Sequence, residues 1–313
     1  ILSFYLYFCQ LYFLFLKKIL IIQTASIGDV ILVTSLFEKL HQFYPDAQID
    51  VLVKDGNQQL FQGHPYLHYI FVWVKKKHKK YKNLLVLIRE VRAQKYDYVV
   101  NVQRFMSSGV LTVFSGAKWK IGFRKNPLSI FFTKSFKHLI SFKLGSPHEL
   151  ERNHQLIREI TDSKIAPTRL YPSQHDYAFT SGYKTSAYIC IAPTSLWFTK
   201  QFPAERWVEL IKLLPDDYNI YLLGAKSDDA ICMQIIKEVG RLNAISMCGK
   251  LTLLESAALM RDAQMNYVND SAPLHLACAV NAPVTAVFCS TVPEFGFGPL
   301  TSNSKVVQIE ENL

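Results

Sequence analysis

KILIIQTASIGDVILVTSLFEKL, residues 18–40, contains the pattern that decides the fold. It opens with a run of apolar, mostly β-branched residues, 18–23, which predicts a buried strand. The segment TASIGD, 24–29, interrupts this run with a glycine, and apolar residues then recur over 30–43 at the spacing of an amphipathic helix. The pattern therefore predicts a strand, a tight turn and a helix.

Short apolar runs and helical patterns alternate in the same way along the rest of the chain. Because strands that alternate with helices usually pair in parallel, the sequence predicts an α/β protein with doubly wound sheets. Further strands are predicted at 49–53, 70–74 and 98–102 and, in a second series, at 188–192, 220–223, 265–268 and 284–289; helices are predicted at 84–94, 149–161, 204–214, 228–239, 253–261 and 273–279.

The two series are separated by an irregular stretch, 162–185, which contains Pro167, Pro172 and Gly182. Prolines, glycine and polar residues without periodicity are typical of a connection between domains. Ligands of open α/β sheets bind beyond the carboxyl ends of the strands, so a cleft between two domains is the expected site. We predict an apolar N-terminal extension, a first domain, a linker and a second domain, at residues 1–16, 17–165, 166–187 and 188–313.

The composition excludes a largely disordered chain, because 50% of the 313 residues are hydrophobic and 19% are charged. The formal net charge of +10 favours an anionic partner, such as a phosphorylated lipid, a sugar nucleotide or a nucleic acid. Six cysteines are scattered without a CxxC pair, mostly inside apolar runs. They are predicted to be core thiols in a reducing compartment rather than a disulfide or zinc framework.

Two segments favour contact with a membrane or an anionic surface. Residues 1–16 are almost wholly apolar, but they are fewer than the about 20 residues of a membrane span. An interfacial or signal-anchor segment, a buried extension and a mis-assigned start stay open as interpretations. The basic run KKKHKK, 75–80, predicts a solvated loop, or else a surface that guides an anionic acceptor or rests on an acidic leaflet. A nucleic-acid groove is disfavoured, because no DNA- or RNA-binding motif accompanies the run.

Asp29 is the candidate catalytic residue. It follows Ser26 and Gly28 in the loop between the first strand and the first helix, where glycine permits a tight turn and the close approach of a substrate. A carboxylate at this edge of a sheet can take the proton from an acceptor hydroxyl. The alternative is that Asp29 only caps the helix, and spacing alone favours this alternative.

Two loops of the second domain are predicted to hold a diphosphate. In the first, Thr194, Ser195 and Lys200 follow a strand, and they offer neutral donors for phosphate oxygens together with one positive charge. In the second, NDSAPLH, 269–275, joins a strand to a helix whose first N–H groups attract phosphate. The alternatives are a surface loop for the first, and an N-capping aspartate with a satisfied helix histidine for the second.

Other motifs are weaker or missing. Asp228 follows a strand in GAKSD and can reach a ribose hydroxyl, or it simply starts a helix. The Gly/Pro-rich segment 290–299 is predicted to close over the diphosphate, with a plain loop as the alternative. No Walker A loop is present and no GxGxxG follows the first strand, which argues against a P-loop NTPase and an NAD dehydrogenase. The nine histidines lack metal-ligand spacing, so neither a metal nor another cofactor is expected.

Five segments in order make the chain resemble glycosyltransferase family 9 from about Lys17 to its end. They are the opening stretch, APTSLWFTKQFPAERW, YLLGAKSD, CGKLTLLESAALM and NDSAPLHLACAVNAPVTAVFCSTVPEFGFGP. Known members are ADP-heptose:lipopolysaccharide heptosyltransferases of the GT-B fold, in which two Rossmann-like domains with mostly parallel sheets face each other. The resemblance implies that the first domain binds the acceptor and the second domain the donor. Because the family commonly continues past the position of Leu313, we expect the sequence to be a fragment.

The resemblance also implies roles for single residues. Asp29 matches the family's general base, with Ser26 and Gly28 on the acceptor side. Ala272 replaces the family's usual glycine and adds a methyl group beside the expected phosphate site. Donor contacts are implied for the hydroxyl pair Thr194 and Ser195, the phosphate-binding Lys200, the ribose-contacting Asp228, the segment Asp270, Ser271, Ala272 and His275, and the threonine after the last strand, Thr291.

These residues predict an inverting transfer of a heptose-like sugar from a nucleotide-diphosphate donor, ADP-heptose in the first instance, to a lipopolysaccharide-core or related glycan. The expected partners are this donor and an anionic glycolipid at the inner membrane surface, with no nucleic acid and no metal. The expected location is cytoplasmic and peripheral to the inner membrane. The alternatives are a GT-B enzyme that uses a UDP-sugar, a sugar-nucleotide epimerase, a non-catalytic nucleotide- or glycan-binding protein, and RNA binding through 75–82.

Overall fold

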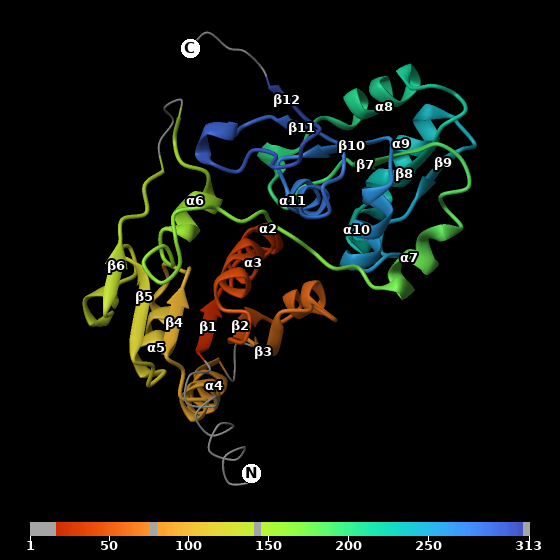
Figure 1. Cartoon of the computed structure of the whole chain (residues 1–313). Coiled ribbons are helices and arrows are strands. Elements are labelled where there is room, and N and C mark those ends of the chain that lie inside the picture. The colour runs from red at the N-terminus through yellow and green to blue at the C-terminus, as the bar shows by residue number, and fades with distance from the viewer. Residues whose placement is uncertain (1–16, 76–79, 141–144, 309–313) are drawn as a thin grey trace, which may run out of the picture.

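The computed structural model describes residues 17–75, 80–140 and 145–308. Two six-stranded sheets, in the orders β3-β2-β1-β4-β5-β6 and β12-β11-β10-β7-β8-β9, lie in separate halves of the molecule (Figure 1). All neighbouring strands of these sheets are parallel. The prediction of two doubly wound α/β units is confirmed.

The first half places helices on both faces of its sheet. Leu20 and Ile22 of β1 pack in one cluster with Leu87 of α4, whereas Ile19 and Ile21 belong to the cluster on the other face. This alternation follows from the two-residue period of a strand that is buried on both sides. The strands are β1 (Lys18–Ile22), β2 (Gln48–Lys54), β3 (Leu67–Trp73), β4 (Tyr98–Asn101), β5 (Trp119–Phe123) and β6 (Lys134–Phe136); the helices are α2 (Ile27–Leu32), α3 (Thr34–Phe43), α4 (Lys80–Ala93), α5 (Met106–Phe114) and α6 (Glu149–His154).

The second half repeats this arrangement. Trp207 of α8 and Ile235 of α9 pack with Ile191 of β7 on one face, and Leu259 of α10 and Leu274 of α11 lie in the cluster on the other. The strands are β7 (Tyr188–Ala192), β8 (Asn219–Leu222), β9 (Ala244–Ser246), β10 (Met265–Asn269), β11 (Val284–Phe288) and β12 (Ser304–Gln308); the helices are α7 (Gln174–Ser181), α8 (Ala204–Leu213), α9 (Asp229–Val239), α10 (Leu253–Arg261) and α11 (Ala272–Ala279).

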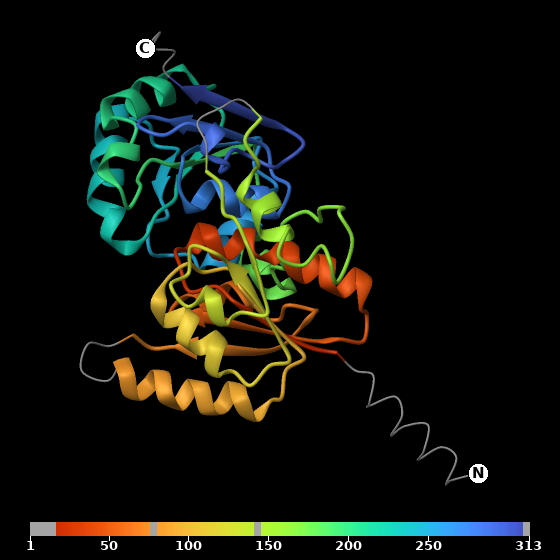
Figure 2. The same cartoon turned by 90° about the vertical axis from the view of Figure 1, so that its left-hand side faces the viewer.

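The two halves meet where α2 packs against α11, and both Figure 1 and Figure 2 show these helices side by side. One hydrophobic cluster runs through this contact, because it contains Val30 and Ile31 of α2 together with Leu274 of α11. The carboxyl ends of β1 and β10 lead directly into these two helices. The contact therefore brings together the two strand edges at which the site was predicted.

A second contact joins the start of α6 to the loop 293–298 of the second half. The Glu149 N–H donates to the Gly296 carbonyl at 2.8 Å, and Arg152 donates from Nη2 to the Phe295 carbonyl at 2.8 Å. His148 donates from Nε2 to the Gly298 carbonyl at 3.1 Å. Gly296 has a φ of +93°, a conformation that favours glycine. Three carbonyls of one half are thus held by one turn of helix from the other.

The segment predicted as the linker, 166–187, packs closely against both halves. Arg169 donates its N–H to the Thr34 hydroxyl of α3 at 3.0 Å, and Leu170 donates its N–H to the Ala279 carbonyl of α11 at 3.0 Å. The segment also contains α7, which begins with a capping box formed by Ser173 and Asp176.

The predicted helix over 30–43 is two helices, α2 and α3, which divide at Val33. Next to this break the Thr34 hydroxyl donates to the Ile31 carbonyl at 2.7 Å and the Ser35 hydroxyl to the Leu32 carbonyl at 2.9 Å. Such side-chain bonds offer the backbone an alternative to the helical pattern. The helix predicted over 149–161 ends as α6 at His154, and turns follow it.

Within the described ranges, no helix has the length and apolar character needed to cross a bilayer. Residues 1–16 and most of the basic run, 76–79, lie outside the described residues. The five cysteines of the described ranges are free, as predicted; Cys190, Cys232, Cys248 and Cys278 are buried, and Cys289 is partly buried.

Candidate active site

Asp29 is the third residue of α2, one turn beyond the carboxyl end of β1. The N-cap of this helix is Ser26, so Asp29 is not the N-cap itself. The Asp29 carboxylate does accept hydrogen bonds from the Ser26 N–H and the Ser26 hydroxyl, so the backbone bond that the capping alternative expected is present. Asp29 is half-buried, which leaves part of its surface open to a substrate.

Burial raises the pKa of Asp29 above the usual value of an aspartate, and the nearby negative charge of Glu149 adds to this rise. The hydrogen bond from Ser26 and the positive charge of Arg104 act in the opposite direction. A raised pKa makes a carboxylate a stronger base, because efficiency improves as its pKa approaches the working pH. The environment of Asp29 therefore suits proton abstraction better than that of an exposed aspartate.

Gly28 of α2 lies against His275 of α11, where the two halves of the molecule meet. A Cβ atom on Gly28 would lie 2.7 Å from Cδ2 of His275, so the absence of a side chain allows α2 to approach α11. His275 is buried, and its Nδ1 atom has no hydrogen-bond partner in the described part of the chain. Burial lowers the pKa of His275 to about 4, so the imidazole is neutral at pH 7. The prediction of a satisfied helix histidine is therefore wrong.

The second half contributes a cluster of Lys200, Asp270 and Thr291. The Asp270 carboxylate is 4% exposed and accepts hydrogen bonds from the Lys200 ammonium and, at 2.7 Å, from the Thr291 hydroxyl. Asp270 follows β10, and the N-cap of α11 is Ser271, so the prediction of an N-capping Asp270 is wrong. Asp270 instead fixes Lys200, whose ammonium keeps donors for a further anion because it has three N–H groups.

The first turn of α11 lies beside this cluster. Its N-cap, Ser271, makes no side-chain cap, and its hydroxyl donates to the Asn269 carbonyl at 3.4 Å. Ala272 is the first helical residue, and Pro273 follows it. The uncapped helix start and the Lys200 charge together are what a phosphate group requires.

Three other predicted donor residues have no hydrogen bond or ion pair to this cluster among the described residues. Thr194 and Ser195 follow β7, which neighbours β10, and they are half-buried at the same edge of the sheet. Asp228 lies beyond β8 and accepts the Ala225 N–H at 2.8 Å. Asp228 thus closes the turn before α9, which is the alternative that the sequence offered.

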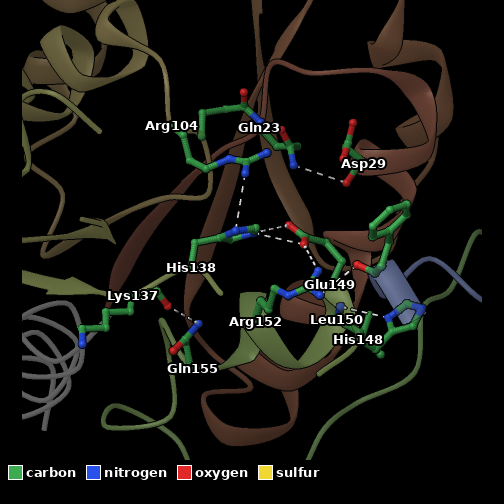
Figure 3. A network of polar contacts seen from close by, with 12 residues as sticks. Gln23, Asp29, Arg104, Lys137, His138, His148, Glu149, Leu150, Arg152 and Gln155 are labelled. Carbon is green, nitrogen blue, oxygen red and sulfur yellow. Dashed lines mark hydrogen bonds and ion pairs between the residues drawn. The ribbon is translucent and has the colours of Figure 1, made fainter. Parts of the chain in front are cut away.

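A polar network near Asp29 was not predicted from the sequence (Figure 3). Arg104 contacts His138, His138 contacts Glu149, and Glu149 pairs with Arg152. These residues lie after β4, after β6 and in α6, and no motif connects them in the sequence. Polar residues that directly follow strands could have indicated these positions in the sequence. The strand β6, however, was itself not predicted.

Two other features lie away from the candidate residues. Among the described residues, His175, Asp176 and Glu255 bring three possible metal ligands within 4.8 Å of one another, but both carboxylates already form capping boxes. A cavity of about 800 Å³ is lined by the segment 165–172 and by Asn281. Neither feature contains a predicted site residue, so neither changes the location of the candidate site.

Comparison with known proteins agrees with this fold and shows the family. Residues 84–313 match the family model described as glycosyltransferase family 9 (heptosyltransferase). The chain belongs to glycosyltransferase family 9. As a member of this family, the protein is a glycosyltransferase. It is 30% identical to lipopolysaccharide heptosyltransferase 3 of Escherichia coli over 281 residues, which cover 84% of this chain and 81% of that protein.

Solved structures confirm the GT-B fold of this family 9 transferase. A family 9 glycosyl transferase from Veillonella parvula DSM 2008 has a TM-score of 0.83 at 22% identity, covering 94% of this chain and 86% of that chain. The E. coli heptosyltransferase WaaC, solved with ADP, has a TM-score of 0.74 at 22% identity and covers 93% of both chains. WaaC has also been solved with ADP-2-deoxy-2-fluoro heptose.

Proposed function

We propose that this glycosyltransferase transfers a heptose-like sugar, with inversion, from ADP-heptose to a lipopolysaccharide-core or related glycan, and that Asp29 is the general base. The donor is supported by the ADP and the ADP-heptose analogue with which WaaC has been solved. The acceptor class is supported by the names of relatives such as lipopolysaccharide heptosyltransferase 3.

One observation carries the proposal. Asp29 stands at the start of α2, and α2 packs against α11, whose start adjoins the Lys200–Asp270–Thr291 cluster. A half-buried carboxylate on one half thus lies near an anion-attracting cluster on the other. The proposed reaction needs a base for the acceptor hydroxyl and anion-binding groups for the donor diphosphate, and the two halves supply them separately.

The proposed reaction is a single displacement. Asp29 takes the proton of the acceptor hydroxyl while that oxygen forms a bond to the anomeric carbon of the donor sugar. The bond between the anomeric carbon and the diphosphate oxygen breaks, and its electron pair leaves with ADP. Lys200 and the start of α11 stabilise the negative charge that develops on the diphosphate.

In this proposal the other donor residues have supporting roles. Thr194 and Ser195 offer hydroxyls to the diphosphate, and Asp228 faces the ribose. Asp270 and Thr291 act through Lys200, which they hold in place. We further propose that the acceptor is an anionic glycolipid at the inner membrane surface, which cell fractionation of the tagged protein tests.

Replacement of Asp29 by Asn tests the base. We expect release of ADP from ADP-heptose, with a deacylated lipopolysaccharide core as acceptor, to fall by about 100-fold or more, because the amide cannot take a proton. Donor affinity, measured by calorimetry, should stay within about threefold of the wild type. The exposed Asp217→Asn variant is the matched control.

Two outcomes contradict the proposal in different ways. Unchanged turnover in Asp29→Asn excludes Asp29 as the base. Release of UDP from a UDP-sugar, or tight donor binding without any product, replaces the heptosyl transfer with one of the alternative functions.

A further inference from the structure

Arg104 lies on the first half, and its charge acts on the proposed base. This positive charge lowers the pKa of Asp29. Arg104 follows β4, which pairs with β1 in the sheet. The preceding residue, Gln103, donates to the side chain of Gln23, and Gln23 donates to the Asp29 backbone carbonyl at 3.4 Å. Arg104 and Asp29 therefore belong to adjoining loops at one strand edge, as Figure 3 shows.

The guanidinium of Arg104 is held by a chain of three polar side chains. Arg104 donates from Nη1 to Nδ1 of His138 at 3.4 Å. Nε2 of His138 lies 3.0 and 3.1 Å from the two Glu149 oxygens. Because an arginine can only donate, Nδ1 of His138 must accept, and Nε2 then carries the proton that is donated to Glu149.

At the inner end of the chain, both terminal nitrogens of Arg152 are bonded, while its Nε has no partner among the described residues. Arg152 donates from Nη1 to Glu149 at 2.7 Å and from Nη2 to the Phe295 carbonyl at 2.8 Å, and the Arg152 side chain is 1% exposed. Burial alone would raise the pKa of Glu149, but hydrogen bonds from His138 and Arg152 hold it below the usual value. Glu149 is therefore ionised, and its charge is balanced by Arg152.

The outer end of the chain is not balanced. Among the described residues Arg104 has no ion pair, and its one described hydrogen bond goes to His138. A guanidinium has five N–H donors, so most of those of Arg104 remain available. A half-buried arginine that is oriented by a histidine and has no ion pair among the described residues matches the geometry of a phosphate or a carboxylate.

We propose that Arg104 determines acceptor specificity by binding an anionic group, a phosphate or a carboxylate, of the acceptor glycan beside Asp29, and that His138 and Glu149 are positioning residues for its guanidinium. This inference rests on the proposed function, because it assigns the two reactants to opposite halves. The anion belongs to the acceptor, since the groups suited to the donor diphosphate lie on the second half.

The test compares one acceptor in three forms: a deacylated lipopolysaccharide core that is intact, dephosphorylated or carboxyl-reduced. Binding is measured by calorimetry without donor, and kcat/KM is measured from ADP release. We expect the wild type to prefer the intact core over one of the two neutralised cores by about tenfold or more, which identifies the anion. Arg104→Gln should bring this preference close to one, with the donor KM unchanged.

The positioning residues are tested in the same assay. His138→Phe, which removes both hydrogen bonds, should lower the preference by about threefold, and His138→Gln, which can accept from Arg104 and donate to Glu149, should restore most of it. His138→Phe should cause no further loss in an Arg104→Gln background, whereas a merely structural role would produce the same loss in both backgrounds.

Two results would overturn the inference. The first is a wild type that binds the intact core no more tightly than either neutralised core, and this result does not depend on turnover. The second is an Arg104→Gln variant that keeps the preference. A wild type that binds the intact core preferentially but releases no ADP contradicts the proposed function and leaves the anion site supported.

Discussion

Two aspartates follow central strands of the two sheets, and their surroundings differ. Asp29, after β1, is half-buried, accepts the Ser26 hydroxyl and has no ion pair among the described residues. Asp270, after β10, is 4% exposed and binds both Lys200 and Thr291. Burial raises the pKa of the first carboxyl, which has no ion pair among the described residues, whereas the second is paired directly with an ammonium.

The difference fits the proposed roles, which are a base for Asp29 and a scaffold for Asp270. A base must have a lone pair that is free to take a proton, and a raised pKa makes that transfer more favourable. A carboxylate that accepts hydrogen bonds from an ammonium and a hydroxyl, as Asp270 does through one oxygen, instead fixes the position of the ammonium. Sequence position alone would have given both aspartates the same role, since each follows a strand and precedes a helix.

Among the variants that test this comparison, Asp270→Ala is expected to have the largest effect on stability and on the donor KM. The variant leaves the Lys200 ammonium, which is 26% exposed, without its carboxylate partner, and we expect the free energy of unfolding to fall by about 2–3 kcal/mol. The donor KM should rise by about tenfold because Lys200 loses its fixed position. Urea unfolding and steady-state kinetics measure the two effects. Wild-type donor KM in a folded variant would contradict the role of Asp270.

A smaller effect is expected from Gly28→Ala, which tests the contact between α2, which carries Asp29, and α11, which follows Asp270. The added Cβ would lie 2.7 Å from the buried His275 ring, so α2 and α11 must move apart at a cost of about 1–3 kcal/mol. Turnover should fall with stability. The control is Gly182→Ala, because a Cβ at Gly182 meets nothing within 4 Å. Equal effects of the two variants would show that the contact is loose.

Asp29→Asn should slightly increase the melting temperature at neutral pH while it removes turnover. The folded-state pKa of Asp29 is raised, so the ionised carboxylate costs stability above that pKa, and the neutral amide removes the cost. The gain should disappear at pH values below the ordinary aspartate pKa of about 3.9, where the carboxyl is protonated in both states. Calorimetric melts across pH check this, and a lower melting temperature at pH 7 would contradict it.

The smallest effect is expected from Ser26→Ala. The Ser26 hydroxyl lowers the pKa of Asp29, so its removal should raise that pKa further. Because the base must be deprotonated, the acidic limb of the kcat/KM profile should move to higher pH, with the alkaline limb unchanged. An acidic limb that stays in place would mean that Asp29 does not control it.

The sequence predicted the second half of the site better than the first. Lys200, Asp270 and Ser271 lie in loops that directly follow predicted strands, so periodicity was sufficient to place them at one edge. The chemistry within the cluster was not predictable in this way. That Asp270 binds Lys200, 70 residues away, is a result of tertiary packing.

The network around Arg104 could not be predicted from the hydrophobic periodicity of the sequence. His138 follows β6, a strand of three partly exposed residues that has no clear alternation, and Glu149 lies in a helix of six residues. Short edge elements carry little periodic signal, because their formation depends on neighbouring strands rather than on local propensity. The same reason explains why β9 and β12 were not predicted.

The hydrogen bonds between the start of α6 and the loop 293–298 connect this loop to the first half. The parts of the molecule that move as rigid bodies therefore need not be divided where the sequence divides the two halves. The Phe295, Gly296 and Gly298 carbonyls are each bonded to a group of the first half. Any rotation that opened the enzyme would either break three bonds at once or leave this loop behind with α6. In mechanical terms the loop belongs to the first half although it is encoded with the second half, and Thr291 lies just where the two would part.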